Sequence, residues 1–358
     1  MKKIYIIAGL FLLASCETLL VPDPVGPERQ IALQARLLTV DTLHTVHAVY
    51  SKYESLEEAK DLTIACYVNG ECVAVTSESE AETAEYKTSV PWRSYKFKAE
   101  IHPGDSVRIE ATGPTEWATA SVKAPDAPPA PEVSMELIPS TFDSYYQHKY
   151  RFQIHVEDQP GKRNWYRLAT LCRQVHNEYR VKSSYYYPVS EEGWFNILDR
   201  TIVIPVDNSM DSFLNPEERV VDKWNKDYLA NEYNFFTDEL FEDGAVDLTL
   251  EANVYHYTRI ENASLGFYGE FSYRTIFYAY FDLQNLSRED YLNSRMLEME
   301  NLSLTGVGWV DDLFLQDIVF PDNVEGGIGF VTVRSVSRAV LKLGESSARD
   351  GLSFWPLE

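Results

Sequence analysis

Basic residues are scarce in this sequence of 358 residues. It has 32 lysines and arginines against 55 aspartates and glutamates, which gives a formal net charge of −23. Nucleic-acid phosphates and anionic lipid headgroups both repel such a chain, so neither is an expected partner. Any attachment to a membrane therefore needs a chemistry other than a basic patch.

The sequence also lacks the short motifs that mark common catalytic sites. It contains no G-x-S-x-G, no H-E-x-x-H and no C-x-x-C. The glycine-rich stretch 325–330, "EGGIGF", is no phosphate loop because no Lys-Ser/Thr follows, and its glycines predict a bulge or a close backbone approach. His44 and His47 fall on opposite faces of a strand and have no partner at zinc spacing, so we interpret them as ordinary histidines. We expect no enzymatic activity.

Cysteines are few as well, with four in the whole chain. The stretch "TIACYVNGECVAV" predicts a hairpin with a type I′ turn at 69–70. In such a hairpin Cys66 faces Val73, and Cys66 and Cys72 point to opposite sides of the sheet. We therefore expect no disulfide between them, and we expect Cys172 to be free too.

No hydrophobic run is long enough to span a bilayer as a helix. The longest near the start, Ile4 to Ala14, follows two lysines and predicts a secretory signal peptide over residues 1–15. Residues 13–16, "LASC", resemble the lipobox of bacterial lipoproteins, in which the cysteine thiol is lipidated after cleavage. We expect Cys16 to carry acyl chains and residues 16–28, rich in proline, to form an extended tether.

The remaining chain predicts a mainly β protein in two parts. Short strands with turn signals over residues 29–123 favour an immunoglobulin-like β-sandwich. A proline-rich linker over 124–134 contains "APDAPPAP", which suits neither a central strand nor a helix interior. Residues 135–358 predict a larger β-rich domain with a few short helices. Capping signals place two of these helices at 215–229 and from Ser287 onward.

One aromatic cluster is the main candidate for recognition of a ligand. Tyr185, Tyr186, Tyr187 and Trp194 lie within "SSYYYPVSEEGWF", and aromatic rings of this kind suit sugars or a protein surface. The alternative is that these rings pack within a sheet, since strands favour aromatic residues in any case.

A weak calcium-loop pattern begins at Asp207. Ser209 at position three, Asp211 at position five and Glu218 at position twelve give oxygen ligands at the spacing of such a loop. Ser212 stands where the sharp turn requires glycine, and a strand rather than a helix precedes the loop. Apart from this calcium candidate we expect no cofactor.

Several stretches together resemble a family of Bacteroidota lipoproteins, catalogued as domain of unknown function 4249. Besides the lipobox, these are "GDSVRIEATGPTEWATASVKAP", "YRFQIHVEDQPGKRNWYRL", "FFTDELFEDG", "LSREDYL" and "FPDNVEGGIGF". In the last, Val324 replaces the usual isoleucine and Phe330 follows directly after Gly329. The resemblance implies an envelope lipoprotein, expected at the outer membrane, whose relatives often accompany TonB-dependent receptors. It brings no catalytic residues.

These observations predict a non-catalytic outer-membrane lipoprotein that binds a partner or ligand, as an accessory of a TonB-dependent receptor or another envelope assembly. A glycan or a peptide is the expected ligand class. Two alternatives stay open: a hydrolase acting on glycan or peptide, and a structural adhesin-type sandwich. The leaflet side is also open, because only Glu17 follows Cys16 as an acidic export signal.

Overall fold

The computed structural model describes residues 29–51, 60–82, 92–138, 147–159, 161–180, 191, 193–214, 231, 233–241, 243–255, 272–304, 321–347 and 354–356. The signal peptide, Cys16 and its tether lie outside these residues. So do Tyr185, Tyr186, Tyr187 and Glu218, together with the helix expected at 215–229.

Alternating hydrophobic and polar residues form short strands before the proline-rich linker. They are β1 (Ile31–Leu38), β2 (Leu43–Tyr50), β3 (Thr63–Val68), β4 (Glu71–Thr76), β5 (Ser79–Glu82), β6 (Trp92–Lys98), β7 (Ser106–Thr112) and β8 (Trp117–Lys123). In β1 and β7 every second residue is buried, as a half-buried strand requires.

Both long strands and very short ones follow the linker. They are β9 (Glu132–Ile138), β10 (Gln147–Glu157), β11 (Trp165–Arg180), β12 (Gly193–Val203), β13 (Val206–Asp207), β14 (Phe235–Thr237), β15 (Ala245–Tyr255), β16 (Ser272–Leu286), β17 (Val324–Glu325), β18 (Ile328–Ser347) and β19 (Phe354–Pro356). The described helices are η2 (Asp238–Leu240) and α2 (Arg288–Leu304). The expectation of a mainly β protein is confirmed.

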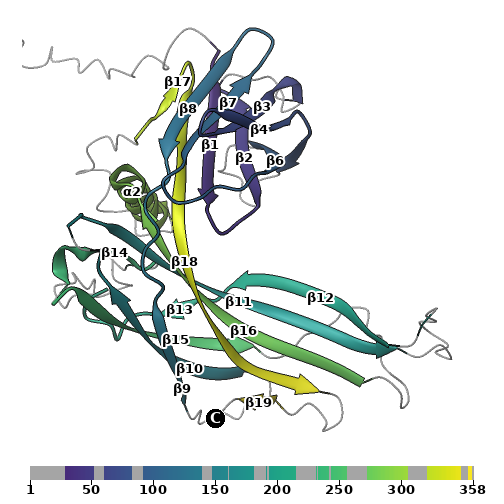
Figure 1. The fold of residues 1–358 in the computed structure, drawn as a ribbon, viewed down its shortest axis with the longest axis vertical. Helices are drawn as coiled ribbons and strands as arrows, with labels where there is room; N and C mark the ends of the chain where they lie inside the picture. The colour runs from purple at the N-terminus through teal and green to yellow at the C-terminus, as the bar shows by residue number, and fades with distance from the viewer. Residues whose placement is uncertain are drawn as a thin grey trace, which may run out of the picture.

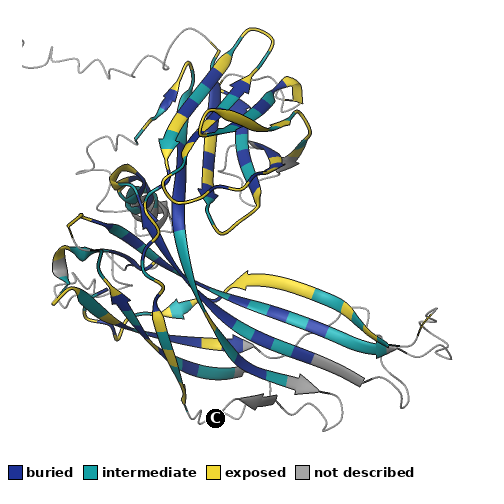
Figure 2. Cartoon of the chain, in the orientation of Figure 1, coloured by how far each residue is buried: buried dark blue, intermediate teal, exposed yellow. Residues whose placement is uncertain are grey.

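The described strands form three sheets. The largest has the order β12-β11-β16-β18-β1-β2-β6-β5, with β14 beside β11 and β19 beside β18. The sheet β17-β8-β7-β3-β4 packs against its N-terminal end, and the sheet β13-β15-β10-β9 packs against its other end (Figure 1). Each packing encloses its own hydrophobic core, and the buried stripes of both are visible in Figure 2.

Strand β18 belongs to both sandwiches. Its first half pairs in parallel with β1, from Ala32 opposite Ile328 to Leu38 opposite Arg334. Its second half pairs antiparallel with β16. In Figure 1 it runs as one yellow ribbon from the upper sandwich into the lower one.

Residues 324–334 therefore complete the N-terminal sandwich, although the sequence interpretation assigned them to the region 135–358. Val324, Val331 and Val333 lie in the first hydrophobic core. The hydrophobic pattern of a strand shows that one face is buried, but not against which sheet, so the sequence could not place this segment.

The proline-rich linker is extended and bonded to the junction of the two sandwiches. Asn285 Nδ2 donates to the carbonyl of Asp126 at 3.0 Å. The hydroxyl groups of Ser335 and Ser337 on β18 donate to the carbonyls of two linker prolines, Pro125 and Pro128. Strand β9 begins at Glu132, so the final linker residues belong to a strand.

The hairpin at 69–70 is confirmed, with positive φ at both Asn69 (52°) and Gly70 (85°). The expected pairing of Cys66 with Val73 is wrong. A β-bulge between Cys66 and Tyr67 puts one extra residue on β4, so that Cys66 faces Ala74 instead. Cys66 and Cys172 are buried and Cys72 is exposed, and all three are free, as expected.

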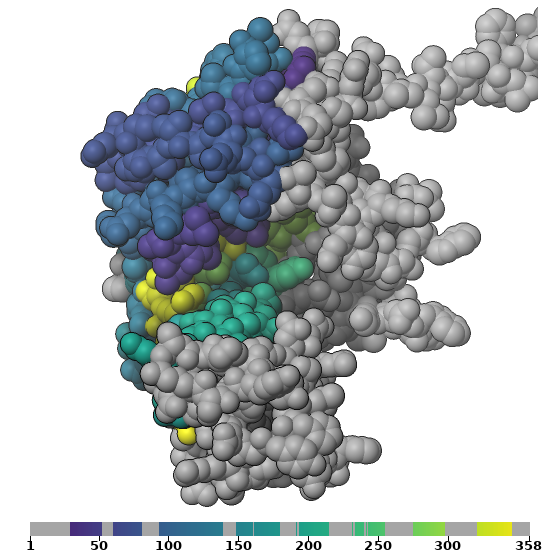
Figure 3. All heavy atoms as spheres, turned by 90° about the vertical axis from the view of Figure 1, so that its right-hand side faces the viewer, coloured from purple at the N-terminus to yellow at the C-terminus, as the bar shows by residue number. Residues whose placement is uncertain are grey.

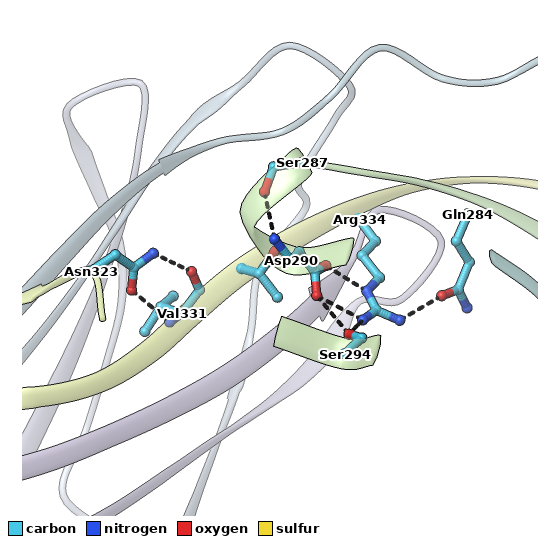
Figure 4. A network of polar contacts seen from close by, with 8 residues as sticks. Gln284, Ser287, Asp290, Ser294, Asn323, Val331 and Arg334 are labelled. Atoms are coloured by element: carbon cyan, nitrogen blue, oxygen red, sulfur yellow. Dashed lines mark hydrogen bonds and ion pairs between the residues drawn. The ribbon is translucent and has the colours of Figure 1, made fainter. Parts of the chain in front are cut away.

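Glycines allow β18 to approach β1 closely. A Cβ at Gly327 would lie 2.4 Å from the carbonyl oxygen of Ile31. A Cβ at Gly329, whose φ is 128°, would lie 2.1 Å from the carbonyl oxygen of Leu33. The prediction of a close backbone approach at "EGGIGF" is confirmed. Just before it, the side chain of Asn323 bonds both the amide and the carbonyl of Val331, at 2.9 and 2.7 Å (Figure 4).

Helix α2 begins where its capping signal predicts. The hydroxyl of Ser287 accepts a hydrogen bond from the amide of Asp290 at 3.1 Å, which satisfies one of the free amides of the first turn. The carboxylate of Asp290 does not return to this cap. It points to β18, beside which α2 lies at the junction of the two sandwiches (Figures 1 and 4).

Candidate functional site

The large sheet has a polar face opposite its two cores, which we call the outer face. The pairing registers place Arg36 of β1, Arg334 of β18, Gln284 of β16 and Arg167 of β11 on this face. Strands β1, β18 and β11 thus each carry an arginine on this face, and Gln284 of β16 lies between the last two; we call these three arginines the arginine row. Helix α2 covers the middle of the row.

Asp290 of α2 neutralises the central arginine. Nε and Nη2 of Arg334 donate to the two carboxylate oxygens of Asp290, at 2.7 and 2.8 Å. Arg334 also donates to Ser294 and Gln284, at 2.8 and 3.0 Å (Figure 4). Both charged side chains are fully buried. Burial alone raises the pKa of Asp290, but the charge and hydrogen bonds of Arg334 outweigh it and hold that pKa below its usual value.

The two flanking arginines keep their charge without such a partner. Arg36 is an exposed residue, although partial desolvation of its side chain still affects its pKa. Burial and the positive charge of Arg334 lower the pKa of Arg36 to about 10. The same two causes, with Arg36 as a third, lower the pKa of Arg167 to about 10. Both arginines therefore remain cationic at neutral pH.

A pocket of about 330 Å³ opens beside Arg36. We call it the β1–α2 pocket, because its lining comes from β1, β2, the turn between them, the start of β18 and Asn293 of α2. Its titratable residues are Arg36, Asp41, His44 and His47. In Figure 3 the purple atoms of the first two strands overhang yellow and green atoms from the C-terminal part of the chain.

The histidines of the pocket point to opposite faces of β2, as expected. His44 is buried, its Nε2 lies 3.2 Å from the carbonyl oxygen of Ala99, and burial lowers its pKa. His47 lies on the outer face, with Nδ1 at 2.9 Å from the hydroxyl of Ser94. Burial raises the pKa of Asp41, while the charges of His44 and Arg338 oppose that rise.

Of the expected aromatic cluster, the structure describes Trp194. It lies on β12 at the edge of the large sheet, 55% exposed, with its ring edge-on to Tyr179 at a centroid distance of 5.7 Å. Trp194 belongs to the C-terminal sandwich and is not part of the β1–α2 pocket. The three tyrosines of the cluster lie outside the described residues.

The calcium candidate is described in part. Asp207 is exposed and accepts a hydrogen bond from the amide of Ser209 at 2.9 Å. Asp211 is buried, and each of its carboxylate oxygens accepts a backbone amide, those of Leu214 and Thr249, at 2.7 and 2.6 Å. Glu218 is outside the described residues, so calcium binding stays a prediction. Within the described ranges, no three His, Cys, Asp or Glu side chains gather into a metal site.

Sequence reasoning missed the arginine row and the pocket. The residues were visible only as ordinary polar members of alternating strands, such as Arg36 in "IALQARLL". These residues come close together only because β1 pairs with β18, and no local sequence signal predicts this pairing. The one available hint was the acidic residue three positions after the Ser287 cap, which the structure uses for Arg334 instead.

Comparisons with known proteins agree with the resemblance. In the part of the chain that the structure describes, no helix has the length and apolar character needed to cross a membrane. A search of curated proteins finds no match to this sequence. A family model with the description "Domain of unknown function (DUF4249)" matches residues 61–339, which include the linker, α2 and the first half of β18. Because this match covers most of the chain, the protein belongs to the DUF4249 family.

Proposed function

We propose that this protein is a non-catalytic lipoprotein of the outer membrane, which binds a ligand in the β1–α2 pocket. It acts as an accessory of a TonB-dependent receptor or a similar envelope assembly. Acyl chains on Cys16 confine it to the plane of the membrane and so raise its effective concentration near the partner.

The pocket is the observation that carries the proposal. Its walls come from β1, β2, β18 and α2, which the fold brings together from distant parts of the sequence. Regular strands and a capped helix hold the lining side chains, so the site is formed before any ligand arrives. Its polar lining suits a hydrophilic ligand, such as a glycan or peptide fragment, better than a lipid.

The contacts of Arg29 show where the chain enters the folded body. Arg29 lies over the ring of Tyr50, 3.6 Å from its centroid, and its Nε is 3.5 Å from a carboxylate oxygen of Glu116. These contacts fix the point where the chain enters the N-terminal sandwich. On this proposal the tether joins the body there, so that the N-terminal sandwich lies nearest the membrane and the C-terminal sandwich, with Trp194, lies farther from it.

Two experiments test the anchor and the partner. Labelling of cells with a palmitate analogue should mark the natural protein and leave the Cys16→Ala form unlabelled and released from the membrane. Affinity purification of the natural protein from solubilised membranes should recover an outer-membrane β-barrel receptor. A protein that is unlabelled in both forms contradicts the anchor, and the absence of any such barrel contradicts the accessory role.

One feature of the pocket favours hydrolysis as the second candidate. Asp41 and His44 both line it, and each shifts the pKa of the other. A hydrolase would need the His44 ring to act as a base. Turnover of envelope glycan or peptide fragments that disappears in His44→Gln, with folding retained, would establish it; unchanged turnover would remove His44 from the chemistry.

A further inference from the structure

We propose that the β1–α2 pocket selects an oxyanion, a carboxylate or phosphate group of a small solute, and that Arg36 is the residue that binds it. The inference rests on the proposed function, since it names the ligand chemistry of the same pocket. It makes this pocket an attractive site for anions on a strongly acidic protein.

The charge on the outer face is unbalanced. The charge of Arg334 lowers the pKa of both Arg36 and Arg167, and the charge of Arg36 also lowers the pKa of Arg167. Among the described residues, Asp290 is the carboxylate that acts on both flanking arginines. Its two oxygens already accept bonds from Arg334, and further bonds from Ser294 and Thr332. Asp290 can therefore compensate one arginine, and two positive charges remain.

Neither flanking arginine finds a substitute partner in the described part of the chain. Arg167 lies 5.4 and 5.6 Å from the ring centroids of Tyr233 and Phe235, which screen it only weakly, and its Nε is buried without a hydrogen-bond acceptor. Arg36 makes no hydrogen bond or ion pair with the described residues, and it lines the pocket. The side chain of Arg36 is exposed and lines the pocket, so an anion that enters the pocket can reach it. Such an anion also offsets the repulsion between Arg36 and Arg334.

The geometry suits a planar oxyanion in particular. A guanidinium group offers parallel N–H donors that match two oxygens of a carboxylate or phosphate. Arg36 lies in the second half of β1, opposite Thr332 of β18, and this pairing holds its backbone in place. Gln34 and Asn293 add neutral hydrogen-bonding groups to the same lining.

Asp41 is the acidic residue of the pocket lining, and its charge interacts with residues other than Arg36. It influences His44 and Arg338, whereas Arg36 responds to Arg334, Asp290 and Tyr233. Arg36 lies on β1 and Asp41 in the turn that follows it, so the two opposite charges come from different parts of the lining. A ligand with an oxyanion at one end and a hydroxyl or amino group at the other fits both parts.

Calorimetric titration of the full mature protein in detergent tests the site, with succinate and inorganic phosphate as probes and glucose as the neutral comparison. We expect saturable binding of at least one anion and none of glucose. Arg36→Gln should weaken that binding about tenfold or more, since a charge-assisted bond is lost. The anion affinity of Arg36→Lys should lie between those of the natural protein and of Arg36→Gln, because lysine keeps the charge but lacks the planar guanidinium group.

Arg108→Gln is the matched control. Arg108 is an exposed arginine on β7, paired with Glu110 at 3.1 Å, and its loss should leave anion affinity within about twofold. Circular dichroism and thermal unfolding verify that each variant folds. If Arg36→Gln unfolds, the rise in melting temperature of the natural protein and of Arg36→Lys with added anion replaces calorimetry.

Absence of saturation by either anion overturns the inference, as does equal binding by the natural protein and Arg36→Gln. These outcomes are distinct from failure of the proposed function. Recovery of a receptor barrel without anion binding would leave the accessory role standing and remove only the oxyanion site.

Discussion

Arg334 and Asp290 form an ion pair in which neither side chain reaches solvent. The pair joins α2 to β18 at the level where β18 passes from one sandwich to the other. A charged residue in such a place is stable only while its partner is present, because each desolvated charge depends on the other. The pair therefore fixes the helix, and with Asn293 it fixes one wall of the β1–α2 pocket.

Removing either charge should cost more than removing both. Asp290→Leu or Arg334→Met leaves an uncompensated buried charge, and we expect each to lower the free energy of unfolding by about 3–5 kcal/mol. The double variant should lose less stability than either single variant, because no uncompensated charge remains buried at this position. Urea unfolding of the four proteins measures this.

The exposed pair Arg108–Glu110 provides the comparison. Its side chains are 44% and 31% exposed, so Arg108→Gln should change stability by less than about 1 kcal/mol. Additive losses in the Asp290–Arg334 cycle would contradict the coupling of the buried pair.

The buried Asp290–Arg334 pair also predicts how the stability of the protein depends on pH. The folded pKa of Asp290 lies below its ordinary value, so its contribution is fully present above about pH 4, the pKa of an unfolded aspartate. The contribution is lost as the pH falls through the folded pKa. Unfolding free energy should therefore rise with pH in this acidic range, and more steeply in the natural protein than in the double variant. Equal slopes would contradict the assignment.

Glycines of the β1–β18 contact should resist substitution. Gly329→Ala places a Cβ against the backbone of Leu33 at a φ of 128°, and we expect a loss of more than about 1 kcal/mol. Gly193→Ala on β12 is the control, because nothing lies within 4 Å of its added Cβ. Thermal unfolding that ranks the two variants equally would argue against the close approach.

Trp194→Ala separates recognition from stability. The ring is 55% exposed, so its removal should change the unfolding free energy by less than about 1 kcal/mol. If the exposed aromatic surface contacts the partner, recovery of the receptor should fall. Val203→Ala, at a 72% exposed position of the same strand, should leave recovery unchanged. Equal recovery with all three proteins would exclude Trp194 from the interface.

The histidines should titrate in two groups. The hydrogen bond of His155 Nδ1 to Asp247, at 2.7 Å, raises the pKa of His155, whereas burial lowers the pKa of His44 and His176. Nuclear magnetic resonance should show midpoints on either side of about 6.5. Asp247→Asn should return His155 toward that value and leave the other two in place. The favourable His155–Asp247 interaction is lost as the pH rises through the folded pKa.

Local features of the fold were predictable, because short-range chemistry decides them. Alternation marks β1, the Asn-Gly pair sets the hairpin at 69–70, and Ser287 starts α2. The glycines of residues 325–330 also predicted a close approach of two backbones. The bulge beside Cys66 was not predictable, since β4 is mostly exposed and its residues show no clear alternation that an extra residue would interrupt.

The site was beyond reach of the sequence because it depends on long-range pairing. The side chain of Arg36 faces away from its own core in any sandwich. Arg36 becomes a candidate binding residue only because β18 brings Arg334 close to it, while α2 supplies one carboxylate, that of Asp290, for three arginines. The family match does not supply this either, since its description names no activity.

The parallel pairing of β1 with β18 also determines when the N-terminal sandwich can complete its folding during synthesis. Residues 31–124 are synthesised long before residues 324–334, yet their core is incomplete without them. Until the ribosome has made that late segment, β1 is an open edge that any other extended chain can join. A nascent or truncated chain that ends before Ile328 thus exposes an unpaired, aggregation-prone edge strand. Cells must shield this strand with chaperones or remove the chain by proteolysis.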